Sequence, residues 1–316
     1  MTATAAEAVR VGIYVPQIQF AYDDLAARAR HCDELGFDSF WLFDHLYGPM
    51  LPEMASFEGW TTATALLTET DRLRVGHMVL CATFRHPALL GKMATTLDVI
   101  SNGRLNFGIG SGSFEPEHVE AGIPWDTLAY RSEILEETLE IVTRMFTGEP
   151  TTFAGKHFQL ERYPNVPGPV QQPRPPVYVG GVGEKRTLPL VARFADVWNV
   201  PTYALGELEH KASVLDAECA RVGRNPADIR RSLEAVMVIA PDDAALADAV
   251  AKGERRFGSP GFGLHDGGYI GTPNQIVDRI GEHRALGFSE FIFFLHDRAA
   301  PDTLELIASD VLPQLD

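Results

Sequence analysis

The sequence predicts a (β/α)₈ barrel, and two observations support this fold class. Hydrophobic runs typical of buried strands alternate with amphipathic helical segments along the chain, and eight strand-like runs can be counted. Such alternation predicts a parallel sheet, and a count of eight favours closure into a barrel over an open sheet. A length of 316 residues would also allow two domains. Because the alternation continues to the C-terminal helix, we expect one barrel over residues 1–316.

The first half of the chain supplies four strands, each followed by a helix. The helix predicted at 22–36 has apolar positions at helical spacing and ends at Gly36, and the helix at 86–103 opens at Pro87, a favoured first-turn residue. Strands are predicted at 11–16, 37–45, 73–84 and 104–113, and helices at 22–36, 59–70, 86–103 and about 126–146.

The second half repeats this rhythm after an insertion. The Pro-rich segment at about 150–176 holds seven prolines and a predicted hairpin at 151–160. Strands are then predicted at 175–181, 196–201, 230–240 and 288–295, and helices at 184–195, 206–223, 242–257, 272–287 and 303–315. The Gly-rich segment 258–271 contains six glycines and is predicted to be a mobile loop or lid.

Composition excludes several classes of protein. The net charge of −16 repels phosphate backbones, so nucleic acid is not an expected partner. The three cysteines form no CxxC motif, which predicts no disulfide framework, no metal site and a reducing cytoplasm. Residues 1–10 lack the pattern of a signal peptide, and no apolar run is long enough to span a membrane. We expect a cytoplasmic globular protein.

In such a barrel, chemistry takes place at the C-terminal ends of the strands. Gly180, Gly181 and Gly183 come directly after a predicted strand and before a helix expected to start near Glu184. Free N–H groups at that helix end would hold an anion such as a phosphate, although glycines also serve tight turns. Lys185 and Arg186 would add local positive charge, unless they are a solvated helix face.

The pair Asp44-His45 ends the second strand. A histidine has an unperturbed pKa of about 6.5, so at the reaction face it would serve as a proton donor or acceptor. The alternative is a structural histidine at a strand end. His86 and His296 also lie near expected strand ends, whereas Trp41, Phe43, Phe84 and Trp198 are more typical of a core than of a cofactor stack.

The third strand, VGHMVLCATFRHP, carries Gly76, His77 and small polar residues where branched apolar residues would be expected. Small residues at a strand end would let a planar ligand approach the backbone. They would equally suit the tapering interior of a barrel.

These motifs, occurring in order, resemble the bacterial-luciferase-like monooxygenase superfamily, and within it the branch that uses the deazaflavin coenzyme F420. The resemblance rests on LGFDSFWLFDH, VGHMVLCATFRHP, LDVISNGRLNFGIGSGS, PPVYVGGVGEKRTLPLVARFADVWN and GTPNQIV with ALGFSEFIFF. It extends from the first strand to the last helix.

The resemblance implies roles for residues at the mouth of the barrel. It implies a bulge in the third strand with a cis peptide between Met78 and Val79, on which the cofactor ring rests, while Cys81 is small enough to let the ring pass. His45 would lie beside the ring carbon that exchanges hydride, and Asp44 would contact the cofactor. Ser111 and Gly112 match cofactor-contacting positions, and Gly180, Gly181, Val182 and Gly183 form the phosphate loop. For the acidic tail of F420, the nearest cations are Lys185, Arg186 and Arg85.

The chain also departs from its sugar-phosphate-oxidising relatives. Ser113 stands where they have a glutamate, Tyr203 and Leu205 occupy the region of a phosphate-binding lysine, and HLYGPM lacks the expected tryptophan. Sugar phosphate is therefore not the expected substrate. We expect hydride transfer between F420 and another small organic substrate. The alternatives are an FMN-dependent monooxygenase and a non-catalytic flavin-binding barrel. The resemblance also implies a homodimer.

Overall fold

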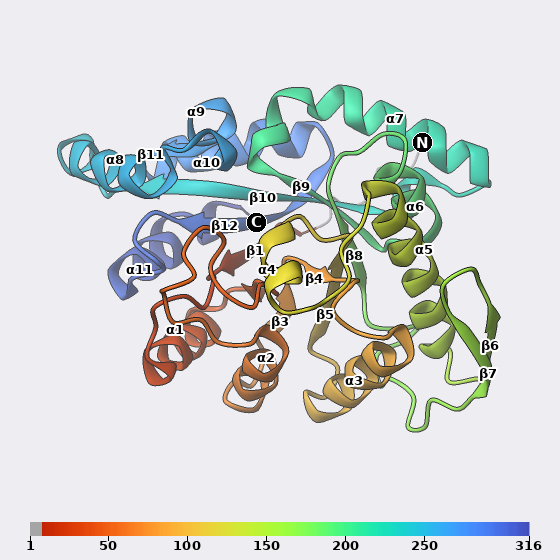
Figure 1. The fold of residues 1–316 in the computed structure, drawn as a ribbon. Helices are drawn as coiled ribbons and strands as arrows, with labels where there is room; N and C mark the ends of the chain where they lie inside the picture. Colours follow the sequence, from red (N-terminus) through yellow and green to blue (C-terminus); the bar gives the residue numbers. More distant parts are fainter. Residues whose placement is uncertain (1–7, 316) are drawn as a thin grey trace.

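In the computed structural model, which describes residues 8–315, eight parallel strand positions close into a barrel surrounded by helices (Figure 1). Neighbours around the barrel follow the order β1, β2, β3, β5, β8, β9, β10 and β12, and β12 pairs with β1 to close it. The predicted fold class is therefore confirmed. The barrel strands are β1 Arg10–Tyr14, β2 Ser39–Leu42, β3 Arg74–His77, β5 Leu105–Gly110, β8 Val177–Gly180, β9 Val197–Pro201, β10 Arg230–Ile239 and β12 Phe288–Leu295.

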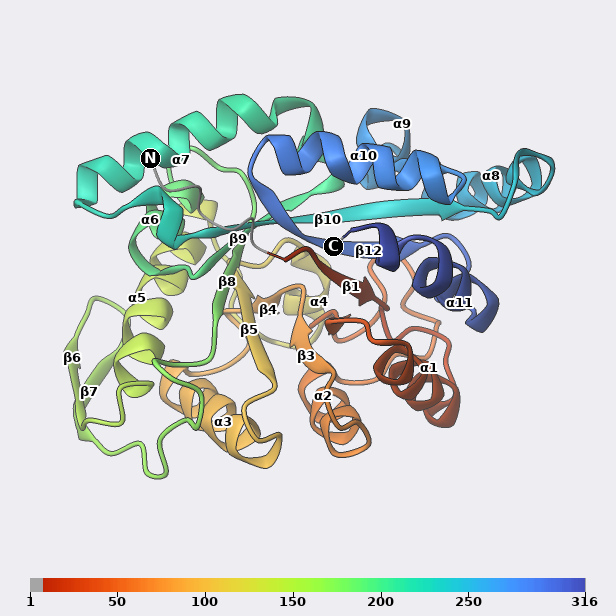
Figure 2. The ribbon, with the colours of Figure 1, turned by 180° about the vertical axis from the view of Figure 1, so that it is seen from behind.

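Helices cover the outside of the barrel, as the views from the two sides show (Figures 1 and 2). Their apolar faces pack against the strands, for example Leu25, Ala29 and Cys32 of the first helix, all fully buried. The helices are α1 Tyr22–Leu35, α2 Gly59–Thr68, α3 Pro87–Ile100, α5 Leu128–Met145, α6 Thr187–Phe194, α7 Leu208–Val222, α8 Asp243–Phe257, α10 Pro273–Ala285 and α11 Pro301–Asp310. Within the described chain, no helix is both long and apolar enough to cross a lipid bilayer.

The third strand is interrupted, as its unusual composition suggested. After β3, the chain forms a short separate strand, β4 (Leu80–Cys81), and both pieces pair with β5. Met78 and Val79 lie between them, and the peptide bond joining them is cis. The predicted cis bond is confirmed.

Gly76 on β3 leaves room for a tryptophan side chain of the barrel interior. The indole of Trp41 points into the barrel and meets the ring of Tyr178 edge-on, with 4.8 Å between ring centroids. A Cβ on Gly76 would lie 2.6 Å from Trp41 Cζ3, and one on Gly12 would lie 2.9 Å from Trp41 Nε1. These glycines make room for Trp41, which confirms the interior-packing alternative for Gly76.

Three segments outside the barrel shape its mouth and its rim. The hairpin predicted in the Pro-rich insertion is present as β6 (Thr151–Ala154) and β7 (Gln159–Tyr163), beside α5 at the periphery (Figure 2). The short helix α4 (Glu115–Glu120) follows β5 and was not predicted. The Gly-rich segment also holds more regular structure than a loop, because it contains a short helix α9 (Leu264–Gly267) and a strand β11 (Tyr269–Gly271) that pairs with β10.

Candidate active site

The C-terminal ends of β2, β4, β5 and β8 enclose a cleft of about 460 Å³. All of the predicted site residues except Lys185 and Arg186 line this cleft, although they come from distant parts of the sequence. They are Asp44, His45, Met78, Val79, Cys81, Ser111, Gly112, Gly180, Gly181, Val182 and Gly183. The strand ends at which the barrel rule places chemistry therefore lie around one cleft.

Val79 forms one wall of the cleft, and glycines on the neighbouring strands fit around it. A Cβ on Gly110 would lie only 2.7 Å from Val79 Cγ2, and one on Gly180 would lie 3.2 Å from Val79 Cγ1. The valine side chain therefore occupies space that side chains on β5 and β8 would otherwise fill. The cleft keeps bare backbone on both sides of Val79, which suits a flat ligand.

The loop after β8 differs in one respect from the expectation. Helix α6 begins at Thr187, not near Glu184, and the N–H groups of Thr187 and Leu188 both donate to the Gly183 carbonyl. Gly181 has a φ of 113°, which side-chain-bearing residues rarely adopt. Among the described residues, the N–H groups of residues 182–185 have no acceptor. The loop therefore holds a run of backbone donors without a protein acceptor, and residues 182 and 183 of this run line the cleft.

Asp44 is held by protein groups on both of its oxygens. Arg85 donates to Oδ2 at 2.7 Å and to Oδ1 at 2.8 Å, and the Cys81 N–H also donates to Oδ2. A second carboxylate, Glu58, accepts from Arg85 at 2.7 Å. This network ties the end of β2 to β4 and to Glu58 at the start of α2, and it commits the Arg85 charge to two carboxylates. Arg85 is therefore not a free cation for an acidic cofactor tail.

His45 is oriented by a residue that the sequence did not reveal. Its Nδ1 lies 2.8 Å from Oε1 of Glu117 on α4, and the other oxygen of Glu117 accepts the Leu46 N–H at 3.0 Å. The Glu117 side chain is 2% exposed and that of His45 26%. No partner for His45 Nε2 exists among the described residues. One ring nitrogen is thus fixed while the other is available to a ligand.

A second missed cluster lies behind the cleft. His118 is fully buried, and its Nε2 lies 2.7 Å from Thr83 Oγ1 and 3.6 Å from Cys81 Sγ. Its Nδ1 lies 2.9 Å from the carbonyl oxygen of Phe114. This cluster anchors α4 to β4 and so fixes the position of the neighbouring Glu117. Burial raises the pKa of the Cys81 thiol to about 11, which keeps it protonated at neutral pH.

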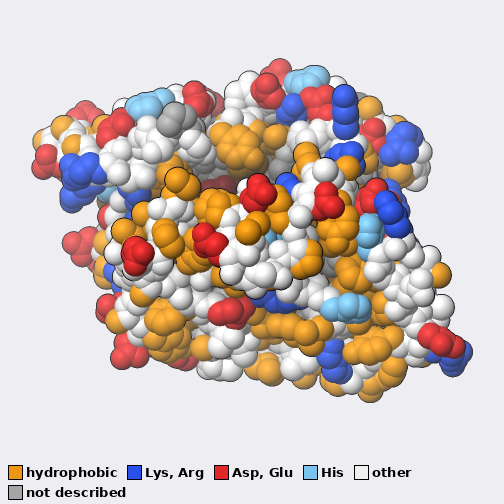
Figure 3. Space-filling model, in the orientation of Figure 1, with side chains coloured by type: hydrophobic (Ala, Val, Ile, Leu, Met, Phe, Trp, Pro, Cys, Tyr) orange, Lys and Arg blue, Asp and Glu red, His pale blue; other side chains and the backbone are white. Residues whose placement is uncertain are grey.

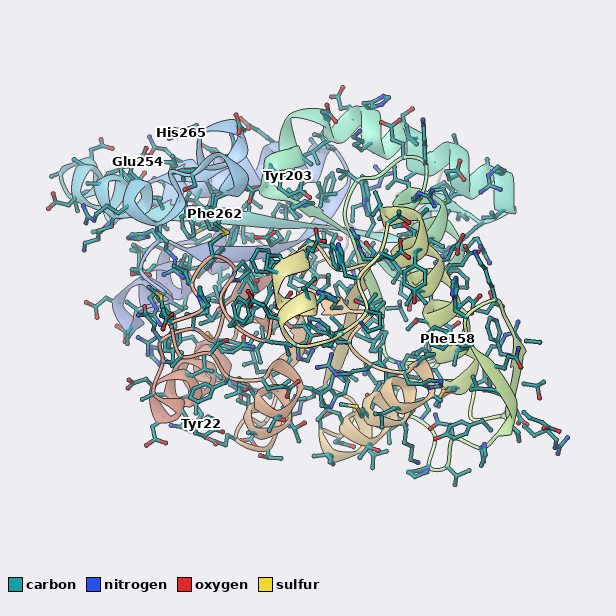
Figure 4. All side chains as sticks on the ribbon, in the orientation of Figure 1. Tyr22, Phe158, Tyr203, Glu254, Phe262 and His265 are labelled. Atoms are coloured by element: carbon teal, nitrogen blue, oxygen red, sulfur yellow. The ribbon has the colours of Figure 1, made fainter. Side chains whose placement is uncertain are left out.

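A second cavity, of about 690 Å³, opens beside the cleft and is largely apolar. It lies between the 46–57 loop and the segment around α9, where Figure 3 shows hydrophobic side chains on the same face of the molecule. Figure 4 shows Tyr203 and Phe262 at the edge of this region. The cleft and the cavity meet at four residues that line both: His45, Ser113, Tyr203 and Glu234.

Glu234 is the most unusual of these residues. It lies on β10 inside the barrel, with no hydrogen-bond or ion-pair partner for its carboxylate among residues 8–315, and burial raises its pKa to about 7. Sequence reasoning missed it, but a signal was present, because it is the lone acid in the apolar run RRSLEAVMVIA.

The other candidate histidines have structural positions. His86 caps α3 by accepting the Ala88 N–H at 3.2 Å, and His296 is buried outside both cavities. Trp41 and Trp198 are fully buried, as expected for core residues. Lys185 and Arg186 are exposed and line a groove of about 450 Å³ next to the glycine loop.

Curated relatives match between about three quarters and almost all of the chain. An F420-dependent glucose-6-phosphate dehydrogenase from Microbacterium testaceum is 27% identical over 342 residues, covering 97% of each chain. An F420-dependent hydroxymycolic acid dehydrogenase from Mycobacterium tuberculosis is 26% identical and covers 76% of this chain and 65% of the relative.

Solved structures share the fold at low identity. The F420-dependent tetrahydromethanopterin reductase of Methanopyrus kandleri superposes with a TM-score of 0.79 at 18% identity, covering 98% of this chain and 100% of the other. An F420-dependent secondary alcohol dehydrogenase in complex with an F420-acetone adduct gives 0.82 at 19% identity, covering 98% and 99%. The family model described as luciferase-like monooxygenase matches residues 4–263. The chain therefore belongs to the luciferase-like monooxygenase family.

Proposed function

We propose that this chain uses coenzyme F420 to oxidise or reduce a small organic substrate by hydride transfer at the mouth of the barrel. One observation carries the proposal: His45 stands where a glycine-walled cleft meets a separate apolar cavity. This arrangement offers one compartment to a cofactor and another to a substrate, with an acid–base group between them. The F420-dependent dehydrogenases among the relatives support the choice of cofactor.

The residues of the cleft fit such a cofactor. The flat surfaces beside Val79 suit the ring. They are kept by Gly110 and Gly180, because a side chain at either position would contact the methyl groups of Val79. The free N–H groups at 182–185 suit a phosphate. Beyond them, the exposed Lys185 and Arg186 line the adjacent groove, a suitable place for an acidic tail in a protein of net charge −16.

The protein supplies the proton chemistry. A bound deazaflavin would supply a hydride donor or acceptor, because carbon replaces nitrogen at its position 5. When Glu117 is ionised it only accepts, so Nδ1 of His45 carries the proton of their shared hydrogen bond. Nε2 then carries a lone pair and can accept a proton. In oxidation, the substrate loses a hydride from carbon and its hydroxyl proton goes to Nε2; in reduction, the proton returns from Nε2 to oxygen.

The cellular location and the oligomeric state of the enzyme are part of the same proposal. A reducing cytoplasm suits Cys32, Cys81 and Cys219, all of which are free and buried. A homodimer is expected from the family resemblance, and sedimentation of the full chain would measure it.

The test is a titration of the full chain with F420 and with FMN, followed by fluorescence at low and high salt. We expect tight F420 binding that weakens with salt, and a smaller salt effect in a variant with Lys185→Met and Arg186→Met. Substrate candidates are then screened by F420 absorbance and by oxygen consumption. Tight FMN binding with substrate-dependent oxygen uptake would make the protein a monooxygenase instead, and binding without turnover of any alcohol or ketone would favour a non-catalytic barrel.

A further inference from the structure

We propose that the apolar cavity binds a substrate with an apolar body and a carboxylate, and that Arg256 and Arg298 hold the carboxylate. This inference rests on the proposed function, which assigns the cavity to the substrate. It adds the chemical class of the substrate and its orientation.

The walls of the cavity define the body of the ligand. Aromatic and aliphatic side chains from four separate segments of the chain face it: Ile18, Phe43, Leu51, Met54, Phe262 and Phe294. A sugar phosphate would place several hydroxyl groups against these walls without partners, at a cost in desolvation. An alkyl chain or an aromatic ring would instead bury apolar surface of both the ligand and the cavity walls.

Arg256 supplies an unusual positive charge in that apolar setting. It lies in the last turn of α8 and lines the cavity, with its guanidinium carbon 4.8 Å from the centroid of the Phe294 ring and 5.3 Å from that of Phe257. In the described part of the chain, no side chain or backbone group forms a hydrogen bond or ion pair with it. Burial lowers its pKa to about 10, so it remains charged at neutral pH.

Arg298 places a second guanidinium at the same cavity. Its Nη2 donates to the carbonyl oxygens of Ile18 and Gln19, and the group stacks 4.1 Å from the Phe20 ring. Carbonyl oxygens orient the guanidinium but leave its charge uncompensated. The nearby Asp297 uses its oxygens for the Ala300 N–H and the Thr303 hydroxyl, and it forms no ion pair with either arginine within 4 Å.

This pair of arginines contrasts with the rest of the protein. Acidic residues exceed basic ones by 16, and the other arginine near the active site, Arg85, is neutralised by two carboxylates. Asp297 offsets part of the charge of Arg256, but in the described part of the chain neither arginine has a carboxylate within 4 Å. Such charges beside an apolar cavity are costly in the empty protein, and a ligand carboxylate would reduce that cost. A guanidinium also matches a carboxylate in shape, by paired N–H donors.

The junction with the cleft, which neither arginine lines, fixes the orientation. There Glu234 and His45 line the junction with the cleft. A ligand carboxylate beside Glu234 would be repelled whenever Glu234 is ionised, whereas one beside Arg256 is attracted. The carboxylate therefore points to the arginines, and the hydroxyl or carbonyl carbon that reacts lies toward His45. The expected substrate is an aliphatic or aromatic acid with its reacting group distant from the carboxylate.

The experiment compares matched probes by calorimetry on the full chain. The pairs are decanoate with decanol, and 4-phenylbutyrate with 4-phenylbutanol, so that only the charged group differs. We expect at least one acid to bind about tenfold or more tighter than its alcohol, the scale of a hydrogen bond to a charged group, and this preference to shrink at high salt. Equal affinities within both pairs, or binding of none of the four, would overturn the proposal.

Variants locate the anion site. Arg256→Met should remove most of the preference for the acid while leaving alcohol binding within about twofold, whereas Arg256→Lys should keep part of it. Arg255→Met is the matched control, because Arg255 is the adjacent residue on α8 but is exposed and lies outside the cavity. An unchanged preference in a folded Arg256→Met variant would contradict the assignment. The measurement needs no F420, so a failure of F420 binding with the acid preference intact would refute only the proposed function.

Discussion

His45 Nδ1 lies 2.8 Å from Oε1 of Glu117, a residue 72 positions away on a helix of six residues. His45 follows β2 and Glu117 lies on α4 after β5, and the buried carboxylate fixes the ring of the partly exposed histidine. This contact converts a histidine at a strand end into an oriented acid–base group.

Replacing His45 by alanine should therefore impair chemistry more than binding. In His45→Ala we expect F420 affinity within a few-fold of the wild type and turnover slower by roughly 10² or more, the scale of a positioned acid–base group. Steady-state kinetics and a fluorescence titration measure the two effects separately. His31→Ala, at the contact of α1 with α11 and outside both cavities, is the control. Lost cofactor binding with normal turnover of the bound form would make His45 a binding residue.

Glu117→Gln tests the positioning role itself. The amide keeps the size of the side chain, but its NH₂ group can donate to Nδ1 and so favour the tautomer in which Nε2 carries the proton. We expect kcat to fall by about 10² with little change in F420 affinity, and the pH profile of kcat to change shape.

The control for this change is Glu120→Gln on the same helix, whose carboxylate accepts from the Tyr47 hydroxyl and from no other group within residues 8–315. A wild-type pH profile in Glu117→Gln would mean that the carboxylate does not set the tautomer of His45.

Arg85→Met should destabilise the fold, because it leaves the carboxylate of Asp44 buried and short of two hydrogen bonds. Removing one partner of a buried ion pair lowers the free energy of unfolding by about 3–5 kcal/mol. Urea denaturation of the cofactor-free protein gives the value, and the exposed Arg255→Met should stay within about 0.5 kcal/mol of the wild type. A loss below 1 kcal/mol would show that Asp44 finds other partners or water.

The sequence was sufficient for the barrel because its signals are local. A strand such as β12 or a helix such as α1 is visible in the spacing of its apolar residues, and α1 ends at Gly36, whose φ of 85° explains the glycine. The cleft could be predicted because all parallel strands point their C-terminal ends to one mouth.

What the sequence did not reveal depends on long-range contacts. Helix α4 is too short to show a hydrophobic period, so neither Glu117 nor His118 was recognised. The partners of Asp44 lie 37 and 41 residues away, and no spacing rule relates them. The start of α6 was placed too early because its first turn lacks a side-chain cap, leaving residues 182–185 outside the helix.

Gly181→Asp tests the glycine loop as an anion site. The position has a φ of 113°, so any side chain there strains the backbone, and Gly181→Ala is the control for that strain. A Cβ at Gly181 meets nothing closer than 3.5 Å, so the first side-chain carbon of either residue has room. We expect the aspartate to weaken F420 binding at least tenfold beyond the alanine, because it adds negative charge beside the free N–H groups. Equal losses in the two variants would assign the effect to backbone strain alone.

The last prediction concerns the pH dependence of stability. Burial raises the pKa of Glu234 from 4.5 to about 7, so between these values the folded protein holds a proton that the unfolded chain has released. Stability should therefore be highest below pH 4.5 as far as this group is concerned, fall as the pH rises toward 7, and level off above it. Glu234→Gln is neutral at every pH and should gain stability relative to the wild type at pH 8, by at most about 3 kcal/mol.

The measurement is the free energy of unfolding in urea at pH 5 and pH 8 for the cofactor-free protein. Burial also raises the pKa of Glu290 to about 7. Because Glu290 is present in both the wild type and Glu234→Gln, its contribution to the pH dependence cancels in their difference. Glu53→Gln, in an exposed loop position, should leave the pH dependence unchanged. If the difference between Glu234→Gln and the wild type is the same at both pH values, Glu234 is ionised in the folded protein at pH 5 as well as at pH 8. A carboxylate with the same charge in the folded and unfolded chains adds no pH dependence to the free energy of unfolding.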